Sequence, residues 1–244
     1  MSFFFDIQNL SFGFTDNQSK LFFVNVSCAF KKNTMNFIRG KNGAGKSTLF
    51  RILRGTVDHT EFITGTIVLN QQSFDLSNGD QRRKLAHSVR LAPQKFDEML
   101  ADQFTFPQNL QLAALPHYPG LDRFVPAATV PKLVDRFGID YAVPAGMLSG
   151  GQRQILAILM ALQKPASILL LDEPTAALDD KNAAMVMTFL NDLLKDNPEL
   201  TILIICHDKE LVEQYAQKHY HKIEVNDDDT RTIHPIATLK ESTL

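Results

Sequence analysis

The stretch GKNGAGKS at residues 40–47 fits the pattern G-x-x-x-x-G-K-[ST] at every defined position. An apolar run, Met35–Ile38, precedes it, and the residues TLFRIL at 48–53 are typical of the start of a helix. Glycines in such a loop allow successive backbone N–H groups to face an anion, and the positive end of the helix dipole adds to the attraction. A glycine-rich turn with a chance lysine is the alternative, but it does not account for the strand before the loop and the helix after it. The stretch therefore predicts a site for the phosphates of a nucleotide.

The roles of single residues in this loop follow from the same pattern. Lys46 is expected to reach the β- and γ-phosphates, and the hydroxyl of Ser47 is expected to bind Mg²⁺. The residues predicted to surround the phosphates are Gly40, Asn42, Gly43, Ala44, Gly45, Lys46, Ser47 and Thr48.

Two adjacent acids follow a second apolar run, Ile168–Leu171. Such a run is commonly a strand that reaches solvent, yet a phosphate-binding loop also needs a carboxylate for its metal ion. We therefore expect Asp172 to hold Mg²⁺ through its water shell and Glu173 to polarise the attacking water. The sequence contains no Asn-Lys-x-Asp element for reading guanine, which disfavours a GTPase.

Composition narrows the class of protein. The chain has 244 residues, of which 44% are hydrophobic and 21% charged, as in ordinary globular proteins. Its 25 Lys and Arg residues against 27 Asp and Glu residues give no basic field of the kind that binds nucleic acid. Two cysteines, Cys28 and Cys206, fit a reducing compartment. No run approaches the ~20 apolar residues of a membrane helix, and the N-terminus lacks the pattern of a signal peptide, so we expect a cytoplasmic protein.

From residue 150 onward, helical patterns alternate with short apolar runs, which favours a parallel sheet built from βαβ units. The alternating segments are Gln152–Gln163, Ser167–Leu171, Lys181–Lys195, Leu200–Cys206 and Lys209–His219. The first third instead predicts short strands, such as Val24–Phe30 with Val24 on its core face, and Gly65–Leu69. The proline-rich middle predicts helices at Gln108–Leu115 and Pro131–Phe137, and the end predicts a strand at Thr230–Ile236 after a turn at residues 227–229.

The run Leu148-Ser149-Gly150-Gly151-Gln152 resembles the signature motif of ABC-type ATPases, which other P-loop proteins lack. Ser149 and the two glycines would form a second anion-binding helix start in the same chain. The resemblance implies a head-to-tail homodimer, in which the signature of one subunit closes over the ATP held by the other. It assigns contacts with that ATP to Ser149, Gly150, Gly151 and Gln152.

Other stretches resemble further elements of this family in the same order along the chain. Gln94, which ends LAPQ at residues 91–94, stands at the place of the glutamine that senses the metal ion and the γ-phosphate. Asp179 ends ALD at residues 177–179, which resembles the loop that crosses the dimer interface. His207 stands at the place of a histidine that contacts the γ-phosphate. The aromatic residue that stacks on adenine is expected at Phe14, and Phe12 is the alternative.

The resemblance runs from about residue 5 to residue 225 and implies a P-loop α/β fold with a mostly parallel sheet. It implies an N-terminal antiparallel β-subdomain and an inserted α-helical subdomain, with the nucleotide-binding core at 1–94 and 149–244 and the helices at 95–148. The implied catalytic residues are Glu173, His207, Gln94 and Lys46, and the implied metal ligands are Ser47, Gln94 and Asp172.

The implied function is ATP hydrolysis that powers transport of a solute through separate transmembrane permease subunits. Thr175–Asp179 and Lys181–Ala184 look like a bacterial uptake subgroup, which also uses an extracytoplasmic substrate-binding lipoprotein. Such a subunit lies on the inner face of the cell membrane, held there by the permease. The alternative is a soluble ABC ATPase that acts in assembly or repair of another macromolecule.

The segment Lys95–Leu115 is expected to dock the permease, since Phe104–Leu110 resembles the stretch that lines the family's coupling groove. The chain also departs from the family pattern. Lys41 replaces a frequent proline, and Ile155 and Met160 stand where many members have arginines. The helix after the signature is therefore expected to be almost wholly apolar.

Overall fold

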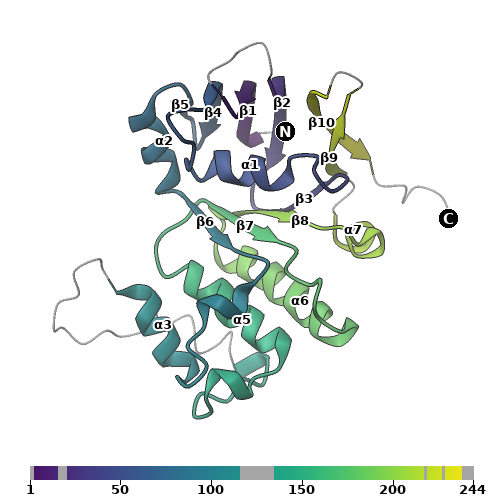
Figure 1. Cartoon of the computed structure of the whole chain (residues 1–244). Helices are drawn as coiled ribbons and strands as arrows, with labels where there is room; N and C mark the ends of the chain where they lie inside the picture. Colours follow the sequence, from purple (N-terminus) through teal and green to yellow (C-terminus); the bar gives the residue numbers. More distant parts are fainter. Residues whose placement is uncertain (1–2, 16–20, 116–134, 217–218, 227–228, 238–244) are drawn as a thin grey trace.

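The computed structural model describes residues 3–15, 21–115, 135–216, 219–226 and 229–237, whose strands form one ten-stranded sheet in the order β5-β4-β1-β2-β10-β9-β3-β8-β7-β6 (Figure 1). The strands are β1 (Phe3–Gly13), β2 (Phe23–Lys31), β3 (Met35–Arg39), β4 (Phe62–Leu69), β5 (Gln72–Asp75), β6 (Val89–Ala92), β7 (Ile168–Asp172), β8 (Thr201–Ile205), β9 (His219–Val225) and β10 (Arg231–Ala237). The helices are α1 (Lys46–Leu53), α2 (Gly79–Ala86), α3 (Phe106–Ala114), α5 (Gly150–Ala161), α6 (Asp180–Asp196) and α7 (Lys209–Tyr215), with short 3-10 helices at η1 (Phe96–Met99) and η2 (Ala145–Met147).

The sheet is antiparallel at one end and parallel at the other. β1 pairs antiparallel with β2 and β4, and β4 pairs antiparallel with β5. At the other end β9, β3, β8, β7 and β6 are neighbours in parallel pairs. β10 joins the two ends through an antiparallel pairing with β9 and a parallel contact with β2. This mixed sheet confirms the predicted α/β class and the antiparallel N-terminal part.

Two hydrophobic cores lie on opposite faces of the parallel strands. Leu170 of β7 packs with Leu49 of α1 and Phe5 of β1 in one core, whereas Leu169 and Leu171 pack with α5 and α6 in the other. In Figure 1, α1 accordingly lies on one side of β7 and β8, and α5 and α6 lie on the other side. Burial on both faces explains why β7 is a continuous apolar run rather than an alternating one.

Several local predictions are wrong, and tertiary pairing is the reason. The helix predicted at Lys209–His219 ends at Tyr215, and His219 begins β9, whose backbone pairs with β3 and β10. Val24, predicted on the core face of β2, is 41% exposed, because Asn25 has a φ of 49° and interrupts the alternation. The sequence patterns predict no separate element at β1, β5, β6, β9 or α2.

The helices below the sheet partly match their predictions. α3 covers the helix predicted at Gln108–Leu115, β10 covers the predicted last strand, and Ile155 and Met160 are buried in the core of α5, as expected of an apolar helix. Most of the predicted helix Pro131–Phe137 and most of the turn at 227–229 lie outside the described residues. The subdomain boundaries at 95 and 148 stay a prediction.

In the described part of the chain, each helix is too short or too polar to span a membrane.

Candidate nucleotide-binding site

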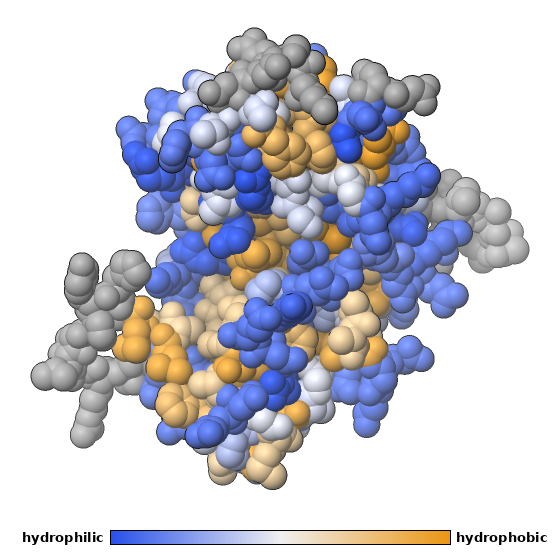
Figure 2. Space-filling model, viewed as in Figure 1, coloured by the Kyte–Doolittle hydropathy of each residue, from blue (hydrophilic) through white to orange (hydrophobic). Residues whose placement is uncertain are grey.

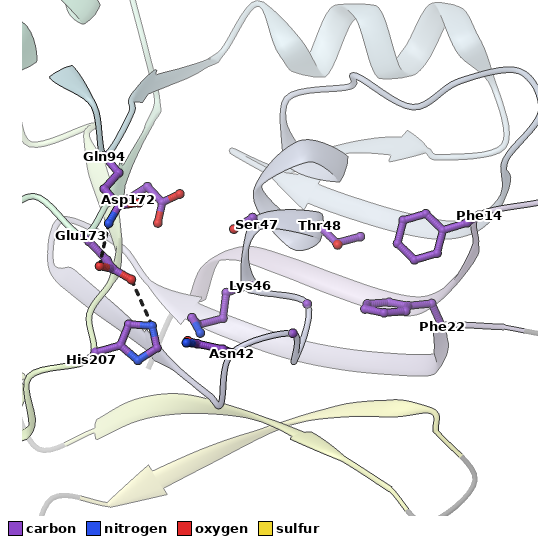
Figure 3. Close-up of a pocket in the computed structure, with 12 residues that line it drawn as sticks. Phe14, Phe22, Asn42, Lys46, Ser47, Thr48, Gln94, Asp172, Glu173 and His207 are labelled. Atoms are coloured by element: carbon purple, nitrogen blue, oxygen red, sulfur yellow. Dashed lines mark hydrogen bonds and ion pairs between the residues drawn. The ribbon is translucent and has the colours of Figure 1, made fainter. Parts of the chain in front are cut away.

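A cavity of about 410 Å³ lies where the carboxyl ends of β3, β6, β7 and β8 meet the start of α1. Side chains that follow these strand ends converge because parallel strands present their carboxyl ends at one edge of a sheet. Figure 3 shows aromatic rings at one end of the cavity, acids and a histidine at the other, and the loop before α1 between them. The lining residues are Phe14, Phe22, Asn42, Gly43, Gly45, Lys46, Ser47, Thr48, Gln94, Asp172, Glu173 and His207.

The phosphate-binding loop has the geometry that its glycines predict. Gly45 precedes α1 with a φ of 104°, which glycine adopts without strain. A Cβ atom at Gly45 would lie 2.6 Å from Cε1 of Phe22, so the loop and the aromatic ring meet only because no side chain intervenes. Lys46 Nζ donates to the carbonyl oxygens of Gly40 at 2.9 Å and Lys41 at 3.1 Å, which places the ammonium group across the loop.

Charges of both signs face the cavity, and burial acts on each. Burial lowers the pKa of Lys46, while the charges of Glu173 and Asp172 act in the opposite direction. Burial also raises the pKa of Asp172, and the charge of Glu173 raises it further. Because burial disfavours both charged forms, each gains from a counter-charge that enters the cavity. An anion beside Lys46 and a cation beside Asp172 satisfy that requirement together.

Glu173 directly follows β7 and is held from two sides (Figure 3). Its Oε2 accepts a hydrogen bond from Nε2 of Gln94 at 3.0 Å, and its Oε1 lies 3.0 Å from Nε2 of His207. The backbone N–H of Glu173 donates to the carbonyl of Ile205 at 3.0 Å, while its φ of 49° is in the left-handed region. That conformation is uncommon outside glycine, and strained residues of this kind cluster at functional sites.

Phe14 and Phe22 form the aromatic end of the cavity. Their ring centroids are 4.9 Å apart with an interplanar angle of 75°. Phe14 is 50% exposed, whereas Phe12 is fully buried, so of the two candidates only Phe14 presents its ring to the cavity. The sequence does not identify Phe22 as a site residue, because it directly precedes Phe23 of β2 and looks like part of that strand. The guanidinium carbon of Arg231 lies 3.9 Å from the centroid of Phe22, a cation–π contact that holds the ring.

The signature residues cap α5 rather than line this cavity. Ser149 Oγ accepts from the N–H of Gln152 at 3.3 Å, and Oε1 of Gln152 accepts from the N–H of Ser149 at 3.0 Å, which is a capping box. Asp179 caps α6 by accepting from the N–H of Asn182 at 2.8 Å. Hydrogen bonds from Asn182 lower the pKa of the Asp179 carboxyl. Of the residues that the structure describes, Ser149, Gly150, Gly151, Gln152 and Asp179 are not among those that line the cavity.

The two signature glycines allow α5 to approach α6 closely. A Cβ atom at Gly150 would lie 2.9 Å from Cδ2 of Leu178. One at Gly151 would lie 2.5 Å from Cε of Met185 and 2.7 Å from Oδ1 of Asn182. A larger residue at either position would require Leu178, Met185 or Asn182 to shift, so the glycines allow the two helix starts to meet as they do.

The remaining predicted residues belong to the loop without lining the cavity. Gly40 offers its carbonyl to Lys46, and Ala44 is buried under the loop at 1% exposure. Sequence reasoning missed Phe22 and Asn182. Phe22 is an aromatic residue just before a strand, and Asn182 is an asparagine in the first turn of a helix. Both features are common in proteins, so neither identifies a functional residue from the sequence.

A glycine-rich loop between β3 and α1, with two acids at the end of β7, a parallel strand of the same sheet, defines a P-loop NTPase. The model of the ABC transporter family matches residues 23–176, so the chain belongs to that family and is an ATPase of the ABC type.

Relatives with established names support the same family. The chain is 34% identical over 187 residues to the phosphonates import ATP-binding protein PhnC 2 of Synechococcus sp. (strain JA-2-3B'a(2-13)), covering 73% of this chain and 67% of that protein. It is 31% identical over 198 residues to the methionine import ATP-binding protein MetN of Bacillus subtilis, covering 80% of this chain and 55% of that protein. The matched part is therefore little more than half of the MetN relative.

Solved structures share the fold. The structure of cbiO1 from Clostridium perfringens, part of the ABC transporter complex cbiONQ, superposes with a TM-score of 0.74 at 24% identity over 99% of this chain and 90% of that one. A dimeric ATP-binding cassette in a post-hydrolysis state, bound to ADP and Pi, gives a TM-score of 0.65 at 20% identity over 96% of this chain and 98% of that one. The likeness confirms the ABC ATPase fold.

Proposed function

We propose that the chain is the ATP-hydrolysing subunit of an ABC importer and that the cavity is its ATP site. The observation that carries this proposal is the order of groups along one cavity, from Phe14 and Phe22 through the loop and Lys46 to Asp172 and Glu173. That order suits a nucleobase, a chain of phosphates and a reacting water in turn. Lys46 would exchange its bonds to loop carbonyls for bonds to the β- and γ-phosphates.

Hydrolysis would use the residues that surround Glu173. Its carboxylate, oriented by Gln94 and His207, would accept a proton as the attacking water adds to the γ-phosphate. His207 lies close enough to Glu173 that one ligand could contact both side chains. The proposed catalytic residues are therefore Glu173, His207, Gln94 and Lys46.

The cavity also fits Mg²⁺. Ser47, Gln94 and Asp172 bring a hydroxyl, an amide and a carboxylate oxygen to it, and Mg²⁺ is usually held by one or two carboxylates together with phosphates and waters. Within the described ranges, no group of three or more His, Cys, Asp and Glu side chains is arranged to hold a metal ion alone. We therefore expect the ion to arrive with ATP. When bound, it would neutralise charge on the phosphate oxygens.

We further propose a head-to-tail homodimer. The N-termini of α5 and α6 attract anions, yet the residues that cap or begin these helices do not line the cavity of their own chain. These residues are Ser149, Gly150, Gly151, Gln152 and Asp179. A second copy would supply them to the ATP bound here. ATP favours the closed pair and product release reopens it, which would drive the membrane partner.

Import is proposed because relatives are named import ATP-binding proteins. Their names differ in the solute, phosphonates in one case and methionine in the other, so the proposal concerns import as a class. The full system would include transmembrane permease subunits and an extracytoplasmic substrate-binding protein. The chain would then lie on the inner face of the cell membrane, held by the permease.

The proposed docking surface for the permease is the segment Lys95–Leu115. Phe104, Leu112 and Leu115 are each 42% exposed, and Figure 2 shows apolar side chains gathered over α3. The buried side chain of Asn109 holds this surface, because its Nδ2 donates to the carbonyl of Phe104 at 3.1 Å. Crosslinks from this segment to a permease would support the assignment, and crosslinks only from the opposite face would contradict it.

The variant Glu173→Gln tests the proposed function. It keeps the size of the side chain but removes the base, so ATP should remain bound, a dimer should accumulate, and turnover should fall about 10²- to 10⁴-fold. Light scattering with ATP and a phosphate-release assay measure these effects, with the exposed Glu210→Gln of α7 as the control. Undiminished hydrolysis would contradict the role of Glu173, and a monomer with ATP bound would contradict the dimer.

A soluble ATPase that acts on another macromolecule is the competing function. Membrane fractionation discriminates the two, since a transporter subunit should co-purify with membranes and a permease. Recovery of the chain in the soluble fraction alone, with a permease present in the cell, would favour the competing function.

A further inference from the structure

One side chain joins the caps of α5 and α6. Asn182, in the first turn of α6, donates from Nδ2 to Oδ2 of Asp179 at 2.8 Å, and its Oδ1 accepts from the hydroxyl of Ser149 at 3.0 Å. Its backbone N–H donates to Oδ1 of Asp179 at 2.8 Å. Two residues from different helices, both predicted to meet the ATP of a second copy, are therefore linked through one amide group.

The chemistry of the three groups fixes the direction of each bond. An ionised carboxylate only accepts hydrogen bonds, so the NH₂ group of Asn182 must face Asp179 and its oxygen must face Ser149. The Oγ of Ser149 already accepts from the N–H of Gln152 at 3.3 Å. Its single proton is then directed to Asn182. Bonds run in one sense from Gln152 through Ser149 and Asn182 to Asp179.

Close packing holds the amide in this position. A Cβ atom at Gly151 would lie 2.7 Å from Oδ1 of Asn182, so the signature glycine leaves just enough room for the side chain. α5 and α6 contact one another along the lower side of the sheet, as Figure 1 shows. The amide therefore lies at the point where both helices begin.

We propose that Asn182 is a positioning residue, which sets the spacing between the Ser149 hydroxyl and the Asp179 carboxylate before two copies of this chain close over ATP. The inference rests on the dimer of the proposed function. Before closure the Ser149 proton is held by Asn182. On closure the hydroxyl turns to a phosphate oxygen, while Asn182 keeps Asp179 in place. Asn182 itself touches no nucleotide and acts through the two caps.

A double-mutant cycle in the Glu173→Gln chain tests this role. ATP-dependent dimerisation is measured for the parent, for Asn182→Ala, for Ser149→Ala and for the chain that carries both changes. Asn182→Ala should weaken the dimer on the order of tenfold, and it should weaken the Ser149→Ala chain by a smaller factor, because the part of its effect that passes through Ser149 is already lost there while the part that passes through Asp179 remains. ATP affinity of the single chain should stay unchanged, since Asn182 is not among the residues that line its cavity.

Two further variants separate positioning from general support of the fold. Asn191→Ala removes an amide from the same helix and should leave dimerisation unchanged. Asn182→Asp preserves size and still accepts from Ser149, but it places a carboxylate against Asp179, so it should weaken the dimer at least as much as Asn182→Ala. Melting curves recorded for every variant confirm that the chains are folded at the temperature of the assay.

The outcomes are distinct. Dimerisation unchanged by Asn182→Ala, or losses that simply add in the double variant, overturns the role of Asn182 while the parent still dimerises. Absence of an ATP-dependent dimer in the Glu173→Gln parent itself overturns the proposed dimer, and with it this role. The Glu173→Gln parent therefore tests the proposed dimer, and the Asn182 variants test the role of Asn182.

Discussion

Nε2 of His207 lies 3.0 Å from Oε1 of Glu173, which joins the residues that follow β8 and β7. The other carboxylate oxygen of Glu173 is held by Gln94 at 3.0 Å. The proposed base is therefore oriented by a contact to each of its two oxygens. Each carboxylate oxygen can accept a second hydrogen bond, so the water that is to be activated can bind to Glu173 while Gln94 and His207 hold its orientation. The first prediction follows from this arrangement.

His207→Ala should reduce turnover about 10²-fold at saturating ATP, because it removes the group that orients Glu173 and that is proposed to contact the γ-phosphate. ATP affinity should change little, since the loop and the aromatic end are intact. Phosphate release and equilibrium binding measure the two effects. The exposed His234→Ala of β10 is the matched control. Equal losses in both variants would show that the effect is not specific to the site.

Phe14→Ala and Phe22→Ala should each weaken ATP binding, with Phe14 more sensitive because its ring is the more exposed. Stacking of a base on an aromatic ring contributes about 1–3 kcal/mol, so affinity should fall about 5- to 150-fold for Phe14→Ala. Tripolyphosphate, which has no nucleobase, should bind the unsubstituted chain and both variants with the same affinity. An equal loss of tripolyphosphate affinity would instead indicate a damaged loop.

Asp172→Asn should raise the melting temperature at neutral pH while it abolishes hydrolysis. The raised pKa means that the folded chain holds the Asp172 proton more tightly than the unfolded chain, whose value is about 3.8. The stabilisation due to that proton is complete below the unfolded value and is lost as the pH rises through the folded pKa. The gain from Asn should therefore shrink as the pH is lowered towards 3.8. A gain that is the same at every pH would contradict this cause.

Arg153→Gln should lower the free energy of unfolding by about 1 kcal/mol. Arg153 is 16% exposed and pairs with Asp97 at 2.8 Å and Asp102 at 2.9 Å, which ties the first turn of α5 to the segment after Gln94. Denaturant titrations at low and high salt should show the loss decreasing with salt. The control is Arg83→Gln, which removes the ion pair between Arg83 and Asp80. These side chains are 75% and 74% exposed, so this change should have little effect on the free energy of unfolding.

The sequence alone determined the phosphate loop, Asp172, Glu173 and the signature cap. These features are contiguous, so their chemistry is local: glycines before a helix start, acids after a buried strand, and a serine three residues before its glutamine. The fold class also followed, since alternating helical and apolar segments admit few arrangements other than a parallel sheet.

Only the tertiary structure decided which distant residues meet. Phe22 reaches the loop because β2 brings it against Gly45, and Asn182 joins Ser149 to Asp179 because α5 packs on α6. β9 became a strand because β3 and β10 offered it backbone partners, although its first residue, His219, was predicted to end a helix. The contacts that complete this site join segments far apart in the chain, and local patterns carry no information about such distances.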